Sequence, residues 1–226
     1  MKYSDNYSPN CWYKDVCDDC IGEDRCIKYS RMRLMMANSN IPVAKRVPIH
    51  LKTPKIDKDA YERLRDIRDD IYNFVYDGKS LYITSDIVGN GKSSSALKLL
   101  MGYFEELLND NRYDDEPVGI FIHVPTFLIR LKEFKTVDYA FEKLKKDLLT
   151  VDLVVWDDIA STDMSSYDLS QLIVYIDNRN MNELSNIYTG NIVNRDDMND
   201  ILGARLTSRI WNSNTEVIEF HGGDRR

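Results

Sequence analysis

Short apolar runs alternate with longer stretches of helical periodicity along most of the chain. Five runs of four to six residues have the composition of buried strands, and they lie at residues 81–85, 119–124, 153–156, 186–189 and 217–220. Residues 59–76 carry apolar side chains at helical spacing, and helical patterns also lie between the strand-like runs. Alternating strands and helices are typical of a parallel sheet flanked by helices. The pattern therefore predicts an α/β domain over residues 59–226.

The first 58 residues have a different character. Residues 1–40 combine a cysteine-rich segment with a short helical pattern at 29–37, and we interpret them as a small N-terminal module. Residues 41–58 carry three prolines and several Lys and Arg side chains, which indicates a basic linker or an irregular segment.

The segment after the first strand-like run has the spacing of a phosphate-binding loop. It reads DIVGNGKS from Asp86 to Ser93, which fits G-x-x-x-x-G-K-[ST] except at the first position. An amphipathic helical pattern starts at Lys92, so a strand, a loop and a helix N-terminus succeed one another. Asp86 stands where glycine is usual, but Asp can adopt the left-handed backbone conformation at some cost. A chance match in a surface turn is the alternative.

This context assigns ATP and Mg²⁺ to particular groups. Lys92 would bridge the β- and γ-phosphates, the Ser93 hydroxyl would bind Mg²⁺, and Ser94 would reach the α-phosphate. Backbone N–H groups of the loop and the helix dipole favour an anion at this position. The candidate nucleotide-binding residues of the loop are Val88, Gly89, Asn90, Gly91, Lys92, Ser93 and Ser94.

Two further strand-like runs are followed by polar residues that suit ATP hydrolysis. Asp157 and Asp158 follow the run at 153–156. Asp157 would hold Mg²⁺ through water, and Asp158 would orient or deprotonate the attacking water. Asn191 follows the run at 186–189, and it could bind the attacking water or the γ-phosphate if that strand lies between the other two. A polar turn or a cap is the alternative role for these residues.

Arg205 and Arg209 are four residues apart, so they share one face of a helix. Near the edge of an oligomer they could reach the γ-phosphate bound by a neighbouring subunit. The alternative is that they are solvated or form an ion pair with Asp200 or Glu216.

The four cysteines all lie near the N-terminus, with the spacing C-x5-C-x2-C-x5-C. They are Cys11, Cys17, Cys20 and Cys26. Two intervening residues allow the central pair to bind one ion, and the outer pair can complete a tetrahedral sulfur site. The pattern favours Zn²⁺ over an iron–sulfur cluster, and four reduced cysteines without a metal are the remaining alternative.

The formal net charge is −7, which excludes binding to nucleic acid through bulk positive charge. DNA contact would need a local basic strip, and Arg130, Lys132 and Lys135 supply one after the second strand-like run. The alternatives are an ordinary amphipathic helix with solvated basic side chains, or DNA contact by the basic segment 45–58. The sequence contains neither an apolar run long enough to span a membrane nor the apolar core of a signal peptide, so we expect a cytoplasmic protein.

Taken in order, these motifs resemble those of the AAA+ ATPases of the DnaC/DnaI-type replicative helicase loaders. That family includes phage-encoded forms and is related to the IstB-like transposition ATPases. The resemblance covers about residue 38 to the C-terminus, in the segments ANSNIP, GNGKSS, LVVWDDIAS, YDLSQLIVYIDNRN, NIYTGN, GARLTSRIW and EFHGGDRR. GNGKSS is similar to the family's Walker A motif, LVVWDDIAS to its Walker B motif, NIYTGN to its sensor 1 strand and GARLTSRIW to its arginine-finger box.

The resemblance implies an AAA+ P-loop fold without a helical lid, and ATP bound between self-associated protomers. It implies that Asn191 is sensor 1 and that Arg209 is the arginine finger, with Arg205 in support. The cysteine-rich module is similar to the helicase-binding domain of the DnaI-type loaders. Asp86 and Asp158 depart from the family, which has glycine and often glutamate there, and these departures bear on the hydrolysis rate more than on nucleotide binding.

The expected function is therefore ATP-dependent loading of a hexameric replicative helicase onto single-stranded DNA during DNA replication. A phage-encoded form would act in the cytoplasm of a bacterial host. An IstB-like transposition ATPase would share the same core, and a nucleotide-binding adaptor or inhibitor of a host helicase loader would not need hydrolysis. The intact set of Lys92, Ser93, Asp157 and Asn191 argues against the adaptor. A small-molecule kinase would not need the paired arginines or the cysteine module.

Overall fold

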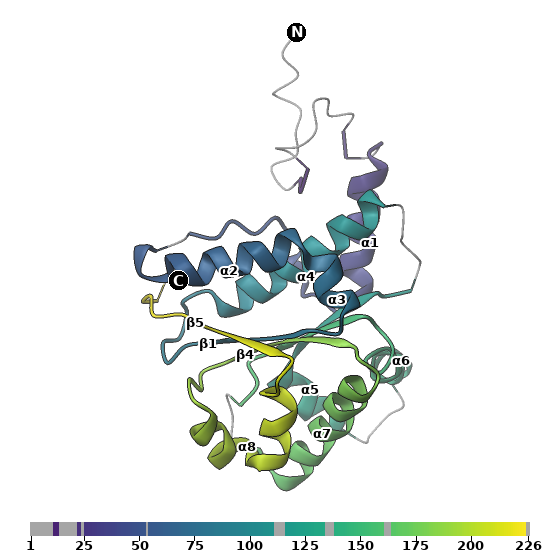
Figure 1. Ribbon diagram of the computed structural model, residues 1–226. Coiled ribbons are helices and arrows are strands. Elements are labelled where there is room, and N and C mark those ends of the chain that lie inside the picture. Colours follow the sequence, from purple (N-terminus) through teal and green to yellow (C-terminus); the bar gives the residue numbers. More distant parts are fainter. Residues whose placement is uncertain are drawn as a thin grey trace.

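A sheet of parallel strands forms the centre of the protein (Figure 1). The computed structural model describes residues 11–13, 22–23, 25–52, 54–110, 116–133, 138–160 and 164–224. Within them the strands are β1 (Ser80–Thr84), β2 (Gly119–His123), β3 (Leu153–Asp157), β4 (Ser185–Gly190) and β5 (Thr215–Glu219). Their order is β2-β3-β4-β1-β5, and every neighbouring pair is parallel. The predicted parallel α/β sheet is confirmed.

Helices cover both faces of this sheet. One group consists of α1 (Ile27–Asn38), α2 (Lys58–Asp69), α3 (Ile71–Tyr76) and α4 (Lys92–Asn109). The other consists of α5 (Val124–Leu131), α6 (Tyr139–Asp147), α7 (Ser166–Met181) and α8 (Arg195–Ile210). Figure 1 shows α1 to α4 above the sheet, and α5, α7 and α8 below it. None of the helices in the described residues is both long enough and apolar enough to cross a membrane.

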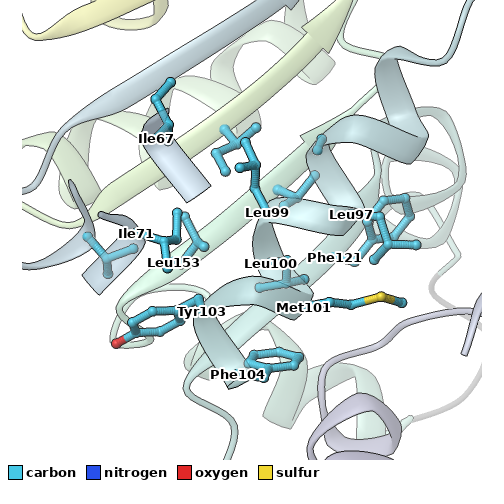
Figure 2. Close-up of a cluster of buried hydrophobic side chains, with 14 of the residues drawn as sticks. Ile67, Ile71, Leu97, Leu99, Leu100, Met101, Tyr103, Phe104, Phe121 and Leu153 are labelled. Atoms are coloured by element: carbon cyan, nitrogen blue, oxygen red, sulfur yellow. The ribbon is translucent and has the colours of Figure 1, made fainter. Parts of the chain in front are cut away.

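Each strand contributes side chains to two separate cores, because successive residues of a strand point to opposite faces. Leu81 and Ile83 pack in the core beneath α1 to α4, whereas Tyr82 packs in the core on the opposite face. In the first core, α4 residues such as Leu100 and Phe104 are buried (Figure 2). Burial on both faces explains why the strands read as continuous apolar runs.

The helical pattern at 59–76 corresponds to two helices rather than one. The chain leaves helical geometry at Asp70, which has φ −121° and ψ 29°. The Asn73 side chain donates a hydrogen bond to Asp70 Oδ1 (2.6 Å) at this break. Ile67 before the break and Ile71 after it both reach the core (Figure 2). Periodicity alone could not reveal the break, because the apolar side chains before and after the break pack in the same core.

Helix α1 shares the core of the α/β domain, although the sequence interpretation grouped it with the cysteine-rich module. Met32 and Met36 are fully buried in that core together with Tyr13. After α1 the chain runs along the edge strand β2, where the Phe121 N–H group donates to the Ser39 carbonyl oxygen (2.9 Å). The packing thus joins the described N-terminal residues to the sheet.

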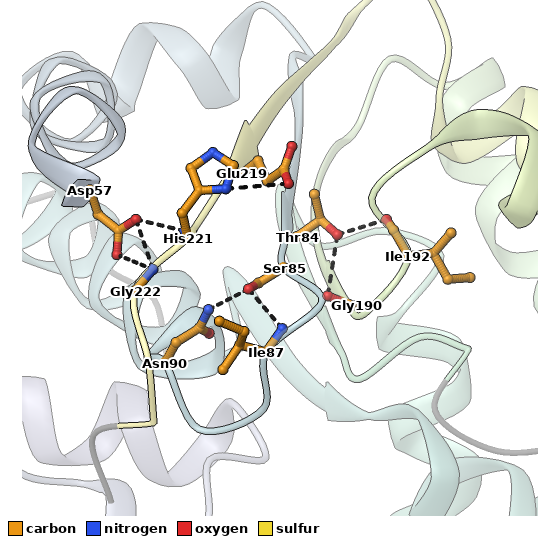
Figure 3. A network of polar contacts seen from close by, with 10 residues as sticks. All are labelled: Asp57, Thr84, Ser85, Ile87, Asn90, Gly190, Ile192, Glu219, His221 and Gly222. Carbon is orange, nitrogen blue, oxygen red and sulfur yellow. Dashed lines mark hydrogen bonds and ion pairs between the residues drawn. The ribbon is translucent and has the colours of Figure 1, made fainter.

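The basic segment 41–58 is irregular, as predicted, but its end is anchored. It contains two short 3₁₀ helices, Val43–Lys45 and Lys55–Asp57. The buried Asp57 carboxylate accepts hydrogen bonds from the backbone N–H groups of His221 (2.7 Å) and Gly222 (3.1 Å) (Figure 3). The segment before α2 therefore holds the residues that follow β5.

A buried arginine joins α7 to the chain that enters β3 and β4. Arg179 is fully buried, and its guanidinium donates to the Asn186 side chain at 2.8 Å. It also donates, at 2.6 to 3.3 Å, to the backbone carbonyl oxygens of Leu148, Val151, Asp152 and Ser185. Burial lowers the pKa of Arg179 to about 10, which leaves the side chain charged at neutral pH. One cation thus satisfies four buried or partly buried carbonyl groups.

Candidate nucleotide-binding site

The phosphate loop, the two aspartates and Asn191, which were predicted to act on a nucleotide, meet at one edge of the sheet. Because β4 lies between β1 and β3, the carboxyl ends of these three strands are neighbours. The phosphate loop follows β1, Asp157 and Asp158 stand at the end of β3, and Asn191 follows β4. In open α/β sheets, ligands bind outside the carboxyl ends of the strands. The tertiary structure therefore gathers groups that are far apart in the sequence.

The phosphate loop is folded around the side chain of Ser85. The Ser85 hydroxyl oxygen accepts hydrogen bonds from the Ile87 N–H group (3.1 Å) and from Asn90 Nδ2 (2.5 Å) (Figure 3). Gly89 and Gly91 have φ angles of 80° and 102°, a region that glycine adopts at little cost. The loop is thus closed by its own side chains and turned by its two glycines.

Asp86, in the place of the usual first glycine, does not disturb this arrangement. The residue is exposed, and its φ angle is not in the left-handed region. The turn that leaves β1 therefore does not require glycine at this position.

Lys92 begins α4 and folds back over the loop. Its ammonium group donates to the Ile87 carbonyl oxygen (2.9 Å) and to Asn90 Oδ1 (3.3 Å). Both acceptors are neutral, so a phosphate would be a stronger partner for this ammonium group. Ser93 is partly exposed and Ser94 is exposed in the first turn of α4, where backbone N–H groups and the helix dipole favour anions.

Thr189 of β4 forms hydrogen bonds with both acidic residues at the end of β3. Its hydroxyl group donates to Asp157 Oδ1 (2.8 Å) and accepts a hydrogen bond from the Asp158 N–H group (2.9 Å). Asp157 is 3% exposed, and Asp158 has a left-handed backbone with φ 64°. Strained backbone of this kind is common beside functional sites. Thr189 was not predicted from the sequence, although a polar side chain inside an apolar strand is the signal that could have identified it.

His123 is a second neighbour of the two acids, and it was not predicted from the sequence. It is the last residue of β2, and its Nε2 atom lies 3.9 Å from Asp158 Oδ2. Its Nδ1 atom lies 2.8 Å from Thr126 Oγ1. The imidazole ring therefore faces the carboxylate that we expect to act on water.

The turn that carries Asn191 is held by side chains of β1. Tyr82 Oη and Thr84 Oγ1 both donate to the Ile192 carbonyl oxygen, at 2.8 Å and 2.7 Å (Thr84 and Ile192 in Figure 3). A Cβ atom at Gly190 would lie 2.6 Å from Tyr82 Oη, so this close approach requires glycine. Asn191 itself is partly buried beside the end of β4.

Arg205 and Arg209 both follow a break in α8 at Gly203, which has φ 77°. They therefore share one helical segment, as their spacing predicts. Arg209 Nε forms an ion pair with Asp177 Oδ1 of α7 at 2.9 Å, whereas Arg205 is exposed. Asp177 is not one of the partners that the sequence suggested. The reach of either arginine to a neighbouring subunit stays a prediction.

The described part of the predicted basic strip is paired with acids of the same chain. Arg130 Nη2 lies 2.7 Å from Asp138 Oδ2, and Lys132 Nζ lies 2.7 Å from Asp168 Oδ2. Lys135 lies outside the described residues. A DNA phosphate would have to displace these carboxylates, so DNA contact at this strip stays a prediction.

The proposed four-cysteine site falls only partly within the described residues. Cys11 and Cys26 are partly buried there, whereas Cys17 and Cys20 lie outside. Among the residues that are described, no group of three or more His, Cys, Asp or Glu side chains could hold a metal ion. Since two of the four ligands are not included in that search, the metal site stays a prediction.

The fold recurs in proteins of DNA replication. Neither a protein-family model nor a curated protein sequence matches the chain. Among solved structures, the DnaC helicase loader is 21% identical with a TM-score of 0.61, over 81% of this chain and 97% of that chain. DnaI is 22% identical with a TM-score of 0.55, over 78% of this chain and 88% of that chain. AMPPCP-bound DnaA from Aquifex aeolicus is 18% identical with a TM-score of 0.52, over 77% of this chain and 50% of that chain. The resemblance seen in the sequence motifs thus extends to three dimensions, and the chain has the fold of DnaC, DnaI and DnaA.

Proposed function

We propose that this protein is an ATP-dependent loader that delivers a hexameric replicative helicase to single-stranded DNA during DNA replication. One observation carries the proposal. The phosphate loop, Asp157 and Asn191 converge at the carboxyl edge of a sheet whose fold is similar to that of the DnaC helicase loader. The expected location is the cytoplasm of a bacterial cell, which would be the host cell if a phage encodes the protein.

ATP would bind at the N-terminus of α4. Lys92 and the backbone N–H groups of residues 88–92 would hold the β- and γ-phosphates, and Ser94 would contact the α-phosphate. The Ser93 hydroxyl and, through water, the buried Asp157 carboxylate would hold Mg²⁺, which neutralises phosphate charge. The left-handed glycines of the loop and the AMPPCP bound to DnaA support this assignment.

Hydrolysis would use the residues that follow β3 and β4. Asp158 would orient or deprotonate the attacking water, and Asn191 would bind that water or the γ-phosphate. Thr189 and His123 would act through Asp158 rather than on ATP, because one fixes its backbone and the other faces its carboxylate. Hydrolysis would then release the helicase.

Replacing Thr189 with valine is expected to slow ATP hydrolysis about tenfold and to change ATP affinity much less. Valine keeps the shape of threonine, but it can neither donate to Asp157 nor accept from the Asp158 N–H group. Hydrolysis at saturating ATP measures kcat, and a fluorescent-nucleotide titration measures affinity. The control is Thr150→Val, at an exposed threonine outside the site. An unchanged kcat would show that Thr189 does not position the acids.

A neighbouring protomer would complete the ATP site, with Arg209 as the arginine finger and Arg205 in support. Arg205 is already exposed, and Arg209 would exchange Asp177 for a γ-phosphate. The Arg209 and Asp177 side chains are 35% and 28% exposed, so their ion pair contributes little in water and the exchange is not costly.

Replacing Arg209 with alanine is expected to preserve ATP affinity and to lower assembly-stimulated hydrolysis about a hundredfold. Mixing this variant with Lys92→Ala should restore part of the activity. At some interfaces the intact ATP site of one protomer then meets the intact Arg209 of its neighbour. Hydrolysis rates across a series of mixing ratios test this expectation. Arg195→Ala, at the exposed start of the same helix, is the control. Failure to recover activity at every ratio would contradict the arrangement.

The cysteine-rich segment would form a Zn²⁺ module that docks the helicase, with Cys11, Cys17, Cys20 and Cys26 as ligands. The purified full chain is expected to contain about one zinc ion per chain, and the Cys17→Ser/Cys20→Ser variant none. Elemental analysis measures the metal content. Removal of zinc should leave ATP binding unchanged, because none of the cysteines belongs to the phosphate loop. Iron would indicate an iron–sulfur cluster, and a metal-free protein would reject the module.

A loading assay tests the function itself. The full chain is mixed with a bacterial hexameric helicase and with single-stranded DNA covered by a single-strand-binding protein, and unwinding of a downstream duplex is followed. We expect ATP-dependent unwinding that Lys92→Ala abolishes while helicase binding persists. If the chain bound the helicase but did not deliver it to DNA in any nucleotide state, the adaptor or inhibitor would be favoured. Binding to a transposase instead of a helicase would favour the IstB-like alternative.

Single-stranded DNA would contact the strip of Arg130, Lys132 and Lys135, or else the basic segment 45–58. DnaA, which has the same fold, has been solved with AMPPCP and single-stranded DNA. At the strip, DNA phosphates would replace the carboxylates of Asp138 and Asp168 as partners of Arg130 and Lys132. Each phosphate contact would make DNA binding more sensitive to salt.

A further inference from the structure

A pocket of about 290 Å³ lies between α2, α4 and the segment that precedes α2. None of the proposed nucleotide-binding residues lines it. Apolar side chains, among them Tyr61 and Leu99, line one part of the pocket. The polar residues of its lining are Arg65, Arg68, Asp69, Ser95 and Lys98. The pocket thus combines an apolar wall with a cluster of cationic side chains.

Ser95 brings a buried hydroxyl group to this pocket. The residue is 1% exposed, and its Oγ atom has no hydrogen-bond partner among the residues that the structure describes. Buried hydroxyl groups are normally hydrogen-bonded, because burial removes them from water. The Ser95 hydroxyl is therefore available to donate to a ligand in the pocket.

The cations of the pocket are crowded and only partly neutralised. Arg68 pairs with Glu105 at 2.9 Å, and it lies against α4 at Gly102, where a Cβ atom would stand 3.2 Å from Arg68 Cγ. Lys98 is partly buried beside Arg68, and no ion pair of Lys98 or Arg65 is found in the described residues. Burial and the charge of Arg68 lower the pKa of Lys98, which Glu105 only partly opposes. Such crowding is relieved when an anion binds between the cations.

We infer that this pocket binds the phosphate group of a small organic phosphate ester. Phosphate offers several acceptor oxygens, so it can accept from the Ser95 hydroxyl and from more than one of the cations at once. The three cationic side chains outnumber the two carboxylates beside them, Asp69 of the lining and the Glu105 that pairs with Arg68, which leaves net positive charge for a phosphate group. The apolar wall and a volume larger than a phosphate ion needs favour an organic group on the ester. This inference is independent of helicase loading and of ATP hydrolysis.

Phosphorus NMR titrations of the full chain test it, with phenyl phosphate and inorganic phosphate as the probes. The chain carries Lys92→Ala, so that the phosphate loop does not contribute. We expect saturable binding in the millimolar range, with phenyl phosphate tighter because its ring contacts the apolar wall. The phosphate groups of DNA could bind to the same cations, so an oligothymidylate is added as a competitor. Displacement of phenyl phosphate by the oligothymidylate would overturn the assignment to a small ester.

Two variants localise the binding. Ser95→Ala and Lys98→Gln should each weaken phenyl phosphate binding about tenfold. Ser95→Ala should keep the thermal unfolding midpoint, because the hydroxyl group has no hydrogen bond in the protein to lose. Lys58→Gln, at an exposed lysine of α2 outside the pocket, should leave binding unchanged. The inference would be overturned by an absence of saturable binding. It would also be overturned if both variants folded and bound phenyl phosphate as tightly as the chain with the pocket intact.

Discussion

Replacing Lys92 with alanine is expected to lower ATP affinity about a hundredfold or more and to abolish hydrolysis. In the structure its ammonium group lies over the loop, bound to the Ile87 carbonyl oxygen and Asn90 Oδ1. Phosphate oxygens would replace these neutral acceptors with charged ones, and hydrogen bonds between ionised groups are the stronger kind. Alanine removes the charge and both bonds, although the backbone of α4 remains. A fluorescent-nucleotide titration measures the loss.

Lys79→Ala is the matched control for this experiment. Lys79 precedes β1, at the opposite end of the strand from the loop, and pairs with Asp77 at the surface. Its replacement should leave ATP affinity within about twofold, because exposed ion pairs contribute little. If Lys92→Ala bound ATP with unchanged affinity, the nucleotide site would have to lie elsewhere.

Replacing Arg179 with leucine is expected to lower the free energy of unfolding by about 3–5 kcal/mol. Leucine fills part of the volume but donates no hydrogen bond. The carbonyl groups of Leu148, Val151, Asp152 and Ser185 would then lose the cation that satisfies them. Buried carbonyl groups without a donor carry the full cost of their removal from water. Urea unfolding followed by circular dichroism measures the change.

Arg63→Leu provides the comparison for Arg179. Arg63 also forms short hydrogen bonds, to Glu216 at 2.7 and 2.9 Å, but its side chain is about half exposed. Its loss should cost no more than about 1 kcal/mol, since water can replace the partner. Similar destabilisation by the two variants would mean that burial does not set the importance of Arg179.

Much of the candidate site could be predicted from local sequence. Loop spacing, the helix that begins at Lys92, and the acids after an apolar run are all properties of short segments. A polar residue in an apolar strand could mark Thr189 as unusual, but the roles of Thr189 and His123 could not be assigned in this way, because they depend on the acids at the end of the neighbouring strand. The partner of Arg209 was unpredictable for the same reason, since Asp177 lies on a different helix.

The sequence by itself determined the fold class and the strand positions to within two residues, and it supplied the residues of the candidate nucleotide site. These follow from periodicity and motif spacing, which act over a few residues. The tertiary structure decided that β4 lies between β1 and β3, and this order makes the loop, the acids and Asn191 one site. It also decided that Asp57 holds the chain after β5 and that Asp70 separates two helices. These features depend on how helices from distant parts of the chain pack on both faces of the sheet. No single segment of sequence determines this packing.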